Sequence, residues 1–150
     1  MKAIPSSAFW LGWAGVIPFA TLSALVFAGG GGGVDASTAL RALIAYGTII
    51  LSFMGGVQWG LEMSRRDASA PHAIGLTASV LPALVAFAAT FVEPLPALVV
   101  LAAGFILLLV YDLSRIRAGI GPAWYGALRV QLSTAVVLCL IAAMFANTTA

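Results

Sequence analysis

Hydrophobic residues occur in five long runs along the chain, and short segments rich in glycine, proline or polar residues separate them. The runs cover about residues 9–28, 38–63, 73–92, 95–113 and 127–146. Because an α-helix rises about 1.5 Å per residue, about 20 mostly apolar residues are needed to cross a membrane. The runs are apolar on every face, whereas strands of a membrane barrel alternate apolar and polar residues. The pattern predicts an all-α bundle of five membrane-spanning helices that forms one domain over residues 1–150.

The segments between the runs contain residues that end and begin helices. Five glycines at 29–33 follow the first run, and we expect a flexible tether there. Asp35, Ser37 and Thr38 are the candidate caps for the second helix. Residues 93–96, Glu-Pro-Leu-Pro, predict a tight turn that makes the third and fourth helices an antiparallel hairpin. Residues 114–125 form the predicted last loop. The first run is longer than the apolar segment of a typical signal peptide, so we expect it to be retained.

Composition narrows the functional class. Hydrophobic residues make up 62% of the chain and charged residues 8%, whereas soluble domains carry about 25% charged residues. Seven basic and five acidic side chains are too few for the surface of a soluble enzyme or a nucleic-acid-binding protein. The single cysteine, Cys139, lies in an apolar run and has no disulfide partner. We therefore expect a protein surrounded by the lipid bilayer, with no nucleic-acid partner.

The basic residues predict how the chain is oriented. A cytoplasmic N-terminus would leave only Arg41 on the outer side of the membrane. The other six basic residues would then be cytoplasmic: Lys2, Arg65, Arg66, Arg115, Arg117 and Arg129. Because basic residues in short loops stay on the cytoplasmic side, we expect a cytoplasmic N-terminus and an external C-terminus. The expected location is the inner membrane of a bacterium.

Polar residues near the predicted cytoplasmic ends of the helices form the candidate site. Gln58 and Glu62 lie four residues apart and share one helix face, and Asp112 lies at the same depth in the fourth run. Polar side chains in a membrane span usually face the bundle interior, because lipid would leave them unpaired. Asp112 and Arg115 are three residues apart, a spacing that allows an ion pair on one helix face. The candidate cluster consists of Gln58, Trp59, Glu62, Asp112, Arg115, Tyr125 and Arg129.

Two interpretations of this cluster stay open. In the first, it is a charge-balanced network that fixes the helix ends. In the second, it is a shallow pocket facing the cytoplasm, in which Glu62 and Asp112 are acids and Arg129 binds an anion. Neither interpretation assigns a catalytic residue, and we expect no enzymatic activity.

Two further patterns concern helix packing and cofactors. Gly55, Gly56 and Gly60 would let another helix approach the second helix closely. His72 has no second histidine or cysteine at the spacing of metal ligands, so no metal site is predicted. The glycine run at 29–33 lacks the residues of a phosphate-binding loop, and no cofactor is expected.

Several motifs resemble those of the DUF3429 family. They comprise residues 9–19 (FWLGWAGVIPF), Tyr46-Gly47, residues 52–60 (SFMGGVQWG), Asp112, residues 122–125 (PAWY) and Leu128-Arg129. The resemblance extends over nearly the whole chain and implies a five-span protein of bacterial inner membranes or mitochondria. The family carries no assigned activity, so the resemblance implies no mechanism. Its members often have histidine at the position of Gln58, and glutamine does not titrate, so a proton relay through that position is not implied here.

Three functions agree with these patterns. Small size, short loops and glycine-rich helix faces favour an accessory subunit or assembly factor of a larger respiratory or photosynthetic membrane complex. Pro18 and Pro82 inside two runs permit an oligomeric transporter of a small solute or proton. A protein that binds a lipid or quinone head group at the membrane interface is the third. We expect the first of these, with a membrane-protein partner or a second copy of the chain.

Overall fold

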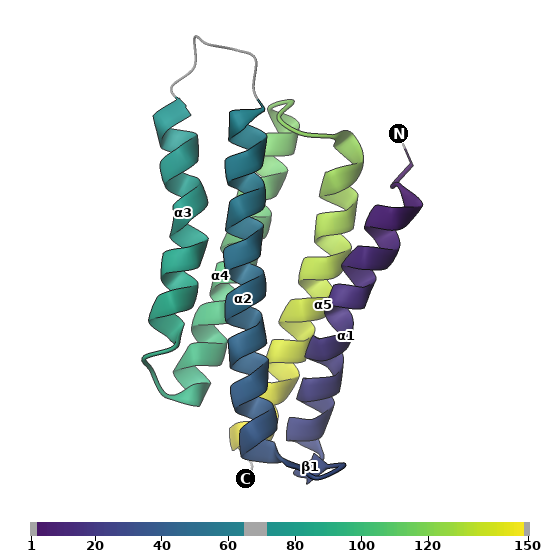
Figure 1. Ribbon diagram of the computed structural model, residues 1–150, viewed down its shortest axis with the longest axis vertical. Helices are drawn as coiled ribbons and strands as arrows, with labels where there is room; N and C mark the ends of the chain where they lie inside the picture. The colour runs from purple at the N-terminus through teal and green to yellow at the C-terminus, as the bar shows by residue number, and fades with distance from the viewer. Residues whose placement is uncertain (1–2, 65–71, 149–150) are drawn as a thin grey trace.

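The structure is a computed structural model that describes residues 3–64 and 72–148. Within these ranges it contains five helices and one short hairpin of strands. They are α1 (Ser6–Phe27), β1 (Gly30–Gly31), β2 (Val34–Asp35), α2 (Ala36–Met63), α3 (His72–Ala89), α4 (Pro94–Arg117) and α5 (Ala123–Thr148). The helices run up and down along one long axis, so the two ends of the chain lie at opposite ends of the bundle (Figure 1). The all-α class is as predicted.

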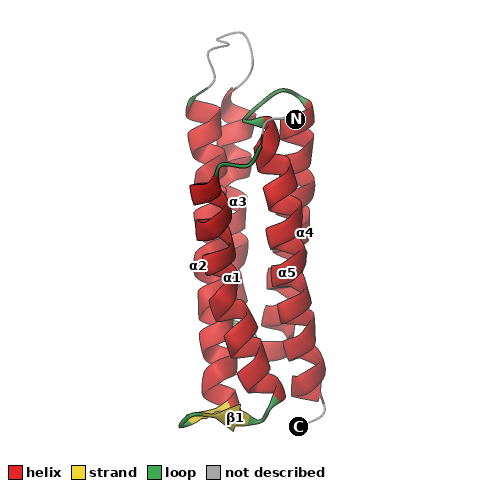
Figure 2. Ribbon diagram, turned by 90° about the vertical axis from the view of Figure 1, so that its right-hand side faces the viewer, coloured by secondary structure: helices red, strands yellow, loops and turns green. Residues whose placement is uncertain are grey.

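The helices pack in two layers around an apolar core. Helices α1, α2 and α3 form one layer and α4 and α5 the other (Figure 2), with α2 in contact with α1, α3 and α4. Phe19 is fully buried between the layers and meets the rings of Tyr46 and Phe105 edge to face, at centroid distances of 5.0 and 5.9 Å. The hydroxyl of the buried Ser23 donates to the Cys139 carbonyl at 2.8 Å and joins α1 to α5.

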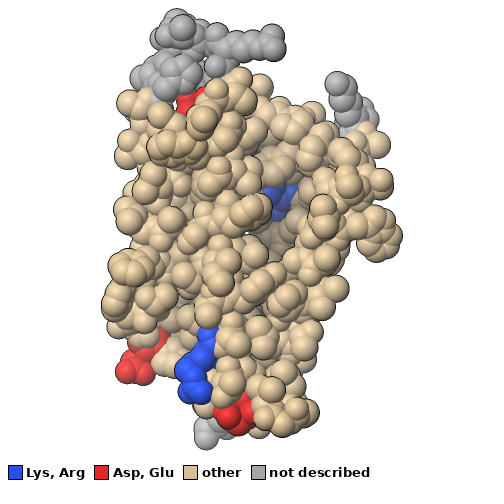
Figure 3. All heavy atoms as spheres, in the orientation of Figure 1, with Lys and Arg blue, Asp and Glu red and all other residues tan. Residues whose placement is uncertain are grey.

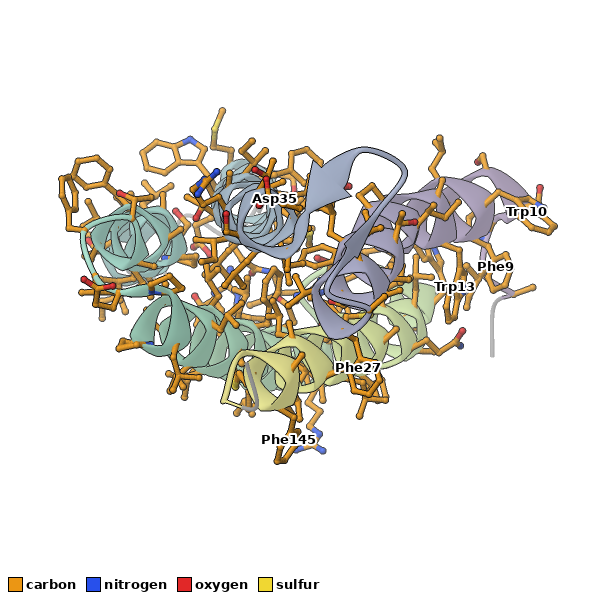
Figure 4. All side chains as sticks on the ribbon, turned by 90° about the horizontal axis from the view of Figure 1, so that it is seen from below. Phe9, Trp10, Trp13, Phe27, Asp35 and Phe145 are labelled. Carbon is orange, nitrogen blue, oxygen red and sulfur yellow. The ribbon has the colours of Figure 1, made fainter. Side chains whose placement is uncertain are left out.

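The outer surface of the bundle is almost entirely apolar. Charged side chains are scarce on the face in Figure 3 and gather mainly toward its lower end. Trp10, Phe27 and Phe145 project outward (Figure 4) and are 70%, 73% and 68% exposed. Water would make such a surface unfavourable, whereas lipid would not. The apolar exterior therefore agrees with an integral membrane protein.

Among the described residues, four helices are long and apolar enough to cross a membrane. They are α1, α2, α4 and α5; helix α3 contributes a shorter apolar stretch, Ala73–Ala89. Helix α3 ends at Ala89, three residues before the predicted end of the third run. Helix α4 continues to Arg117 and α5 begins at Ala123, so the last connection is shorter than predicted and Tyr125 lies on a helix instead of in a loop.

The glycine segment after α1 differs from the expected tether. Gly30 pairs with Asp35 and Gly31 with Val34 in an antiparallel hairpin. Gly32 and Gly33 turn the chain at φ values of 60° and 84°, which glycine adopts without steric cost. The Asp35 carboxylate then accepts a hydrogen bond from the Thr38 amide at 2.8 Å, so Asp35 is the one of the three candidate residues that caps α2.

Candidate functional site

The candidate site lies inside the bundle, toward the end where the chain begins. Helix α2 supplies Gln58 and Glu62, each only 1% exposed, from one face. Helix α4 supplies Asp112 and Arg115, and α5 supplies Arg129. Asp112 is 1% exposed and Arg129 4% exposed. Three helices thus bring two carboxylates, two guanidinium groups and one amide together away from the surface.

Asp112 is the centre of the first part of the network. Its Oδ2 accepts a hydrogen bond from Arg129 Nε at 2.5 Å, and its Oδ1 accepts one from Gln58 Nε2. One carboxylate therefore joins α2, α4 and α5. A buried ion pair needs such additional hydrogen bonds to offset the cost of removing both charges from water.

Glu62 and Arg115 form the second part of the network. Arg115 Nη2 donates to Glu62 Oε2, and the guanidinium lies over the Tyr111 ring at 5.7 Å from its centroid. The ion pair that the spacing of Asp112 and Arg115 allows is not formed, because each of the two residues pairs with another helix. Residues three apart lie side by side on the helix surface, but the partners on α2 and α5 face them across the helix interfaces.

The charges of the network balance within the bundle. Asp112 faces Arg129, and Glu62 faces Arg115, so the two pairs carry no net charge. Both oxygens of Asp112 are engaged in hydrogen bonds. The arrangement is well suited to holding three helices together, because each oxygen of Asp112 accepts a hydrogen bond from a different neighbouring helix.

Trp59 and the glycines beside the cluster have different surroundings. Trp59 is 43% exposed and lies outside the network. A Cβ atom on Gly55 would come within 2.6 Å of the Ser79 carbonyl oxygen, so Gly55 permits close packing of α2 against α3. Gly56 and Gly60 are exposed, and no described atom lies within 4 Å of a Cβ position on either.

Two residues of the site escaped the sequence analysis. Gly75 of α3 lies against the Glu62 carboxyl group, and a Cβ atom there would collide with it. Ser133 of α5 is 2% exposed and lies one helical turn beyond Arg129. The spacing of four residues from Arg129 to Ser133 was the signal available for the second of these.

A cavity of about 180 Å³ adjoins the network. Residues of α1 and α2 form its walls, and α5 and one residue of α4 line the rest. The lining residues are Leu11, Gly12, Gly15, Val16, Phe19, Ile50, Phe53, Met54, Phe105, Arg129, Leu132, Ser133 and Val136. Figure 3 shows a basic side chain recessed in a hollow partway along the bundle. Arg129 is the charged residue that lines the cavity.

Two residues that line this cavity each have a buried polar atom with no hydrogen-bond partner among the described residues. The two atoms are Nη2 of Arg129 and Oγ of Ser133. The Tyr125 hydroxyl is likewise buried without a described partner, although Tyr125 does not line the cavity. Within the described part of the chain, no three histidine, cysteine or acidic side chains are grouped so that they could hold a metal ion.

Comparison with known proteins identifies the family. A family model described as "Protein of unknown function (DUF3429)" matches residues 4–145. The chain belongs to the DUF3429 family. This confirms the resemblance inferred from the motifs, and every network residue of this DUF3429 member lies within the matched region.

This DUF3429 member is also similar to a eukaryotic membrane protein. "Transmembrane protein 69" of Xenopus tropicalis is 34% identical over 146 residues. The match covers 96% of this chain and 56% of the relative, so the chain spans little more than half of that protein's length. No solved structure matches the chain.

Proposed function

We propose that the protein is a non-enzymatic accessory subunit or assembly factor of a larger membrane complex, of the respiratory or photosynthetic kind. The observation that carries the proposal is the internal pairing of its membrane-embedded charges. Asp112 and Glu62 each face an arginine on another helix, so the carboxylates tie helices together. Acid–base catalysis would instead need a carboxylate within reach of a substrate proton.

The outward face of α2 supports a partner at the same depth as the network. Gly56 and Gly60 lie one turn apart, and Trp59 lies beside them and is 43% exposed. In membranes, small residues four apart let a second helix approach the backbone closely and gain van der Waals contact. The partner in this proposal is a helix of another membrane protein or of a second copy of the chain.

The decisive experiment is the native mass of the tagged chain in mild detergent, with co-purifying proteins identified by mass spectrometry. We expect a particle much larger than the 15.4 kDa chain, with a defined set of other membrane proteins. A chain that runs alone as a monomer overturns the proposal. The oligomeric transporter is then the hypothesis to test by solute and proton flux.

A matched pair of variants tests whether α2 makes the contact. Gly60→Leu fills the space above the exposed backbone of α2, and we expect it to release the partner. Ala88→Leu adds the same volume on the exposed side of α3 and is expected to leave the particle unchanged. Equal loss of the particle in both variants would exclude a specific role for α2.

The arrangement proposed in the membrane is five spans with the N-terminus in the cytoplasm of a bacterium. Helix α3 has 18 residues and is about 27 Å long at 1.5 Å per residue, close to the roughly 30 Å of a hydrocarbon core. Arg115 and Arg117 end α4 at the end of the bundle where the chain begins, and Arg41 lies near the other end (Figure 1). Basic residues on the cytoplasmic side favour this orientation.

Cysteine labelling in intact cells tests the orientation. In a Cys139→Ser background, Ala28→Cys places a thiol beside the hairpin and Ala118→Cys places one after α4, and both positions are exposed. We expect a membrane-impermeant maleimide to label Ala28→Cys in spheroplasts, and Ala118→Cys only after the membrane is permeabilised. The reverse pattern would invert the proposed topology.

A further inference from the structure

The cavity beside Arg129 combines an apolar lining with two unused polar atoms. Of its thirteen lining residues, eleven are glycines or have apolar side chains. The other two are Arg129, which is charged, and Ser133, which carries a hydroxyl. Both side chains are more than nine-tenths buried, and Arg129 Nη2 and Ser133 Oγ lack described partners. A buried donor left unpaired costs free energy, so a group that accepts hydrogen bonds from both would be favoured there.

The volume fits a ring or the end of a chain better than a large head group. An engineered apolar cavity of about 150 Å³ binds benzene, and the cavity here is about 180 Å³. The fully buried rings of Phe19 and Phe105 form part of the wall, and aromatic rings pack favourably edge to face or offset against another ring. The space therefore accepts a single planar ring with small substituents.

Charge balance decides between a neutral ligand and an anion. Arg129 is already neutralised by Asp112, and the neighbouring Arg115 by Glu62. An anion in the cavity would add an unbalanced charge in surroundings of low polarity, which is costly. A neutral carbonyl oxygen accepts hydrogen bonds from a guanidinium and a hydroxyl without adding charge.

The route of entry points to a molecule dissolved in the membrane. The cavity lies between α1, α2 and α5, beneath an outer surface that is almost entirely apolar. Phe53 lines the cavity and is 65% exposed, so the apolar wall continues to the surface. A ligand can thus enter from the side, with its tail left in lipid.

We propose that this cavity binds the carbonyl end of a neutral, membrane-dissolved molecule, with Arg129 Nη2 and Ser133 Oγ as hydrogen-bond donors. The carbonyl belongs to a ring of the quinone type or to the ester of a lipid chain. The ring fills the cavity more completely. This site is independent of the proposed subunit role, because it needs no protein partner.

The test measures binding of decylubiquinone to the full chain in detergent, with decanoate as the anionic counterpart of similar chain length. Gly15→Leu projects a larger side chain into the cavity and replaces no network residue, and its Cβ atom has room, since it meets only the Tyr46 hydroxyl, at 4.0 Å. We expect it to raise the dissociation constant at least ten-fold. Ser133→Ala removes one neutral hydrogen bond and is expected to raise it about five-fold.

Ala103→Leu is the matched control, because Ala103 is exposed and lines a separate apolar groove between α3 and α4. We expect this variant to bind decylubiquinone as the unmodified chain does. Elution volume and circular dichroism establish that each variant is folded. Arg129 is left unchanged, because its replacement would break the ion pair with Asp112.

A second arm identifies a lipid source of the carbonyl. The chain is purified from vesicles of ester-linked or ether-linked phosphatidylcholine, and retained lipid is counted by mass spectrometry. Retention of the ester-linked lipid alone, lost in Gly15→Leu, supports the proposal with lipid as the source, whereas decylubiquinone binding supports the ring. Binding of decanoate as tight as that of decylubiquinone refutes the neutral-ligand inference. Equal behaviour of the unmodified chain and Gly15→Leu toward every probe refutes the site.

Discussion

Replacing Asp112 by asparagine tests whether the buried network holds the bundle together. The change keeps the size of the side chain but removes its charge. Arg129, which is 4% exposed, would then carry a positive charge without its carboxylate partner. Gln58 would lose the charged acceptor of its amide hydrogen bond. The substitution therefore affects the connections among α2, α4 and α5 at one point.

The expected cost follows from the burial of the pair. Removing one partner of a buried ion pair typically destabilises a protein by about 3–5 kcal/mol, because the other charge stays buried and uncompensated. Replacing both partners by apolar residues of similar volume is often close to neutral. Asp112→Leu with Arg129→Met would still leave the Gln58 amide unpaired, at a cost of about 1–3 kcal/mol. Adding Gln58→Met to these two changes removes that cost.

Unfolding in mixed micelles measures these differences. The purified chain is titrated with sodium dodecyl sulfate, and helix content and tryptophan fluorescence report the transition. We expect Asp112→Asn to lower the free energy of unfolding most, the double variant to lower it less, and the triple variant to come close to the unmodified chain. Glu93→Gln serves as control, because Glu93 precedes α4 and its side chain makes no capping hydrogen bond.

The order of the variants is the sensitive part of the experiment. If Asp112→Asn costs less than about 1 kcal/mol, the charge is solvated or unimportant, and the network does not hold the helices. If the triple variant is as unstable as Asp112→Asn, the loss comes from disturbed packing instead of an uncompensated charge. Either result would also remove the main support for a structural role of the cluster.

Three further changes have defined outcomes. Gly55→Ala places a methyl group against the α3 backbone and should destabilise the bundle by about 1–3 kcal/mol in the same titration, whereas the adjacent Gly56→Ala should be neutral or slightly stabilising. Gly75→Ala should displace the Glu62 carboxyl and cost a similar amount, with Gly56→Ala again as the control. Hydrogen bonds from neighbouring side chains and the backbone hold the pKa of Asp35 well below its ordinary value of 3.8. Because the folded pKa is lowered, the stabilisation exists above about pH 4 and is lost as pH falls further. The difference in melting temperature between the unmodified chain and Asp35→Asn should therefore be constant from pH 5 to 7 and shrink steadily on acidification below pH 4, and a difference at about pH 2 as large as that at pH 7 would contradict this reasoning.

The sequence predicted those features that depend on neighbouring residues. The lengths of the hydrophobic runs predicted where the helices lie, because the helical rise fixes how many apolar residues are needed to cross a membrane. The spacing of Gln58 and Glu62 placed both side chains on one face, and both are buried. The cap of α2 by Asp35 follows from side-chain chemistry within four residues.

The sequence did not predict the features that depend on how one helix is rotated against another. Arg115 has an acid three residues away on its own helix and another across the interface on α2, and only the packing decides that Glu62 is its partner. Gly75 has no room for a side chain because α3 packs against α2 at the position of the Glu62 carboxyl group. The glycine hairpin is a case of another kind, since glycine permits both an irregular tether and a tight turn.

The structural and binding interpretations of the cluster meet at Arg129. Asp112 engages Nε of the guanidinium, and Nη2 is left without a described partner beside the cavity. The network thus fixes the position of the donor and neutralises its charge at the same time. A donor that is held rigidly and already neutralised favours an uncharged acceptor over an anion. The ion pair that ties α4 to α5 would therefore also set the kind of ligand that the cavity accepts, so the two roles need not be alternatives.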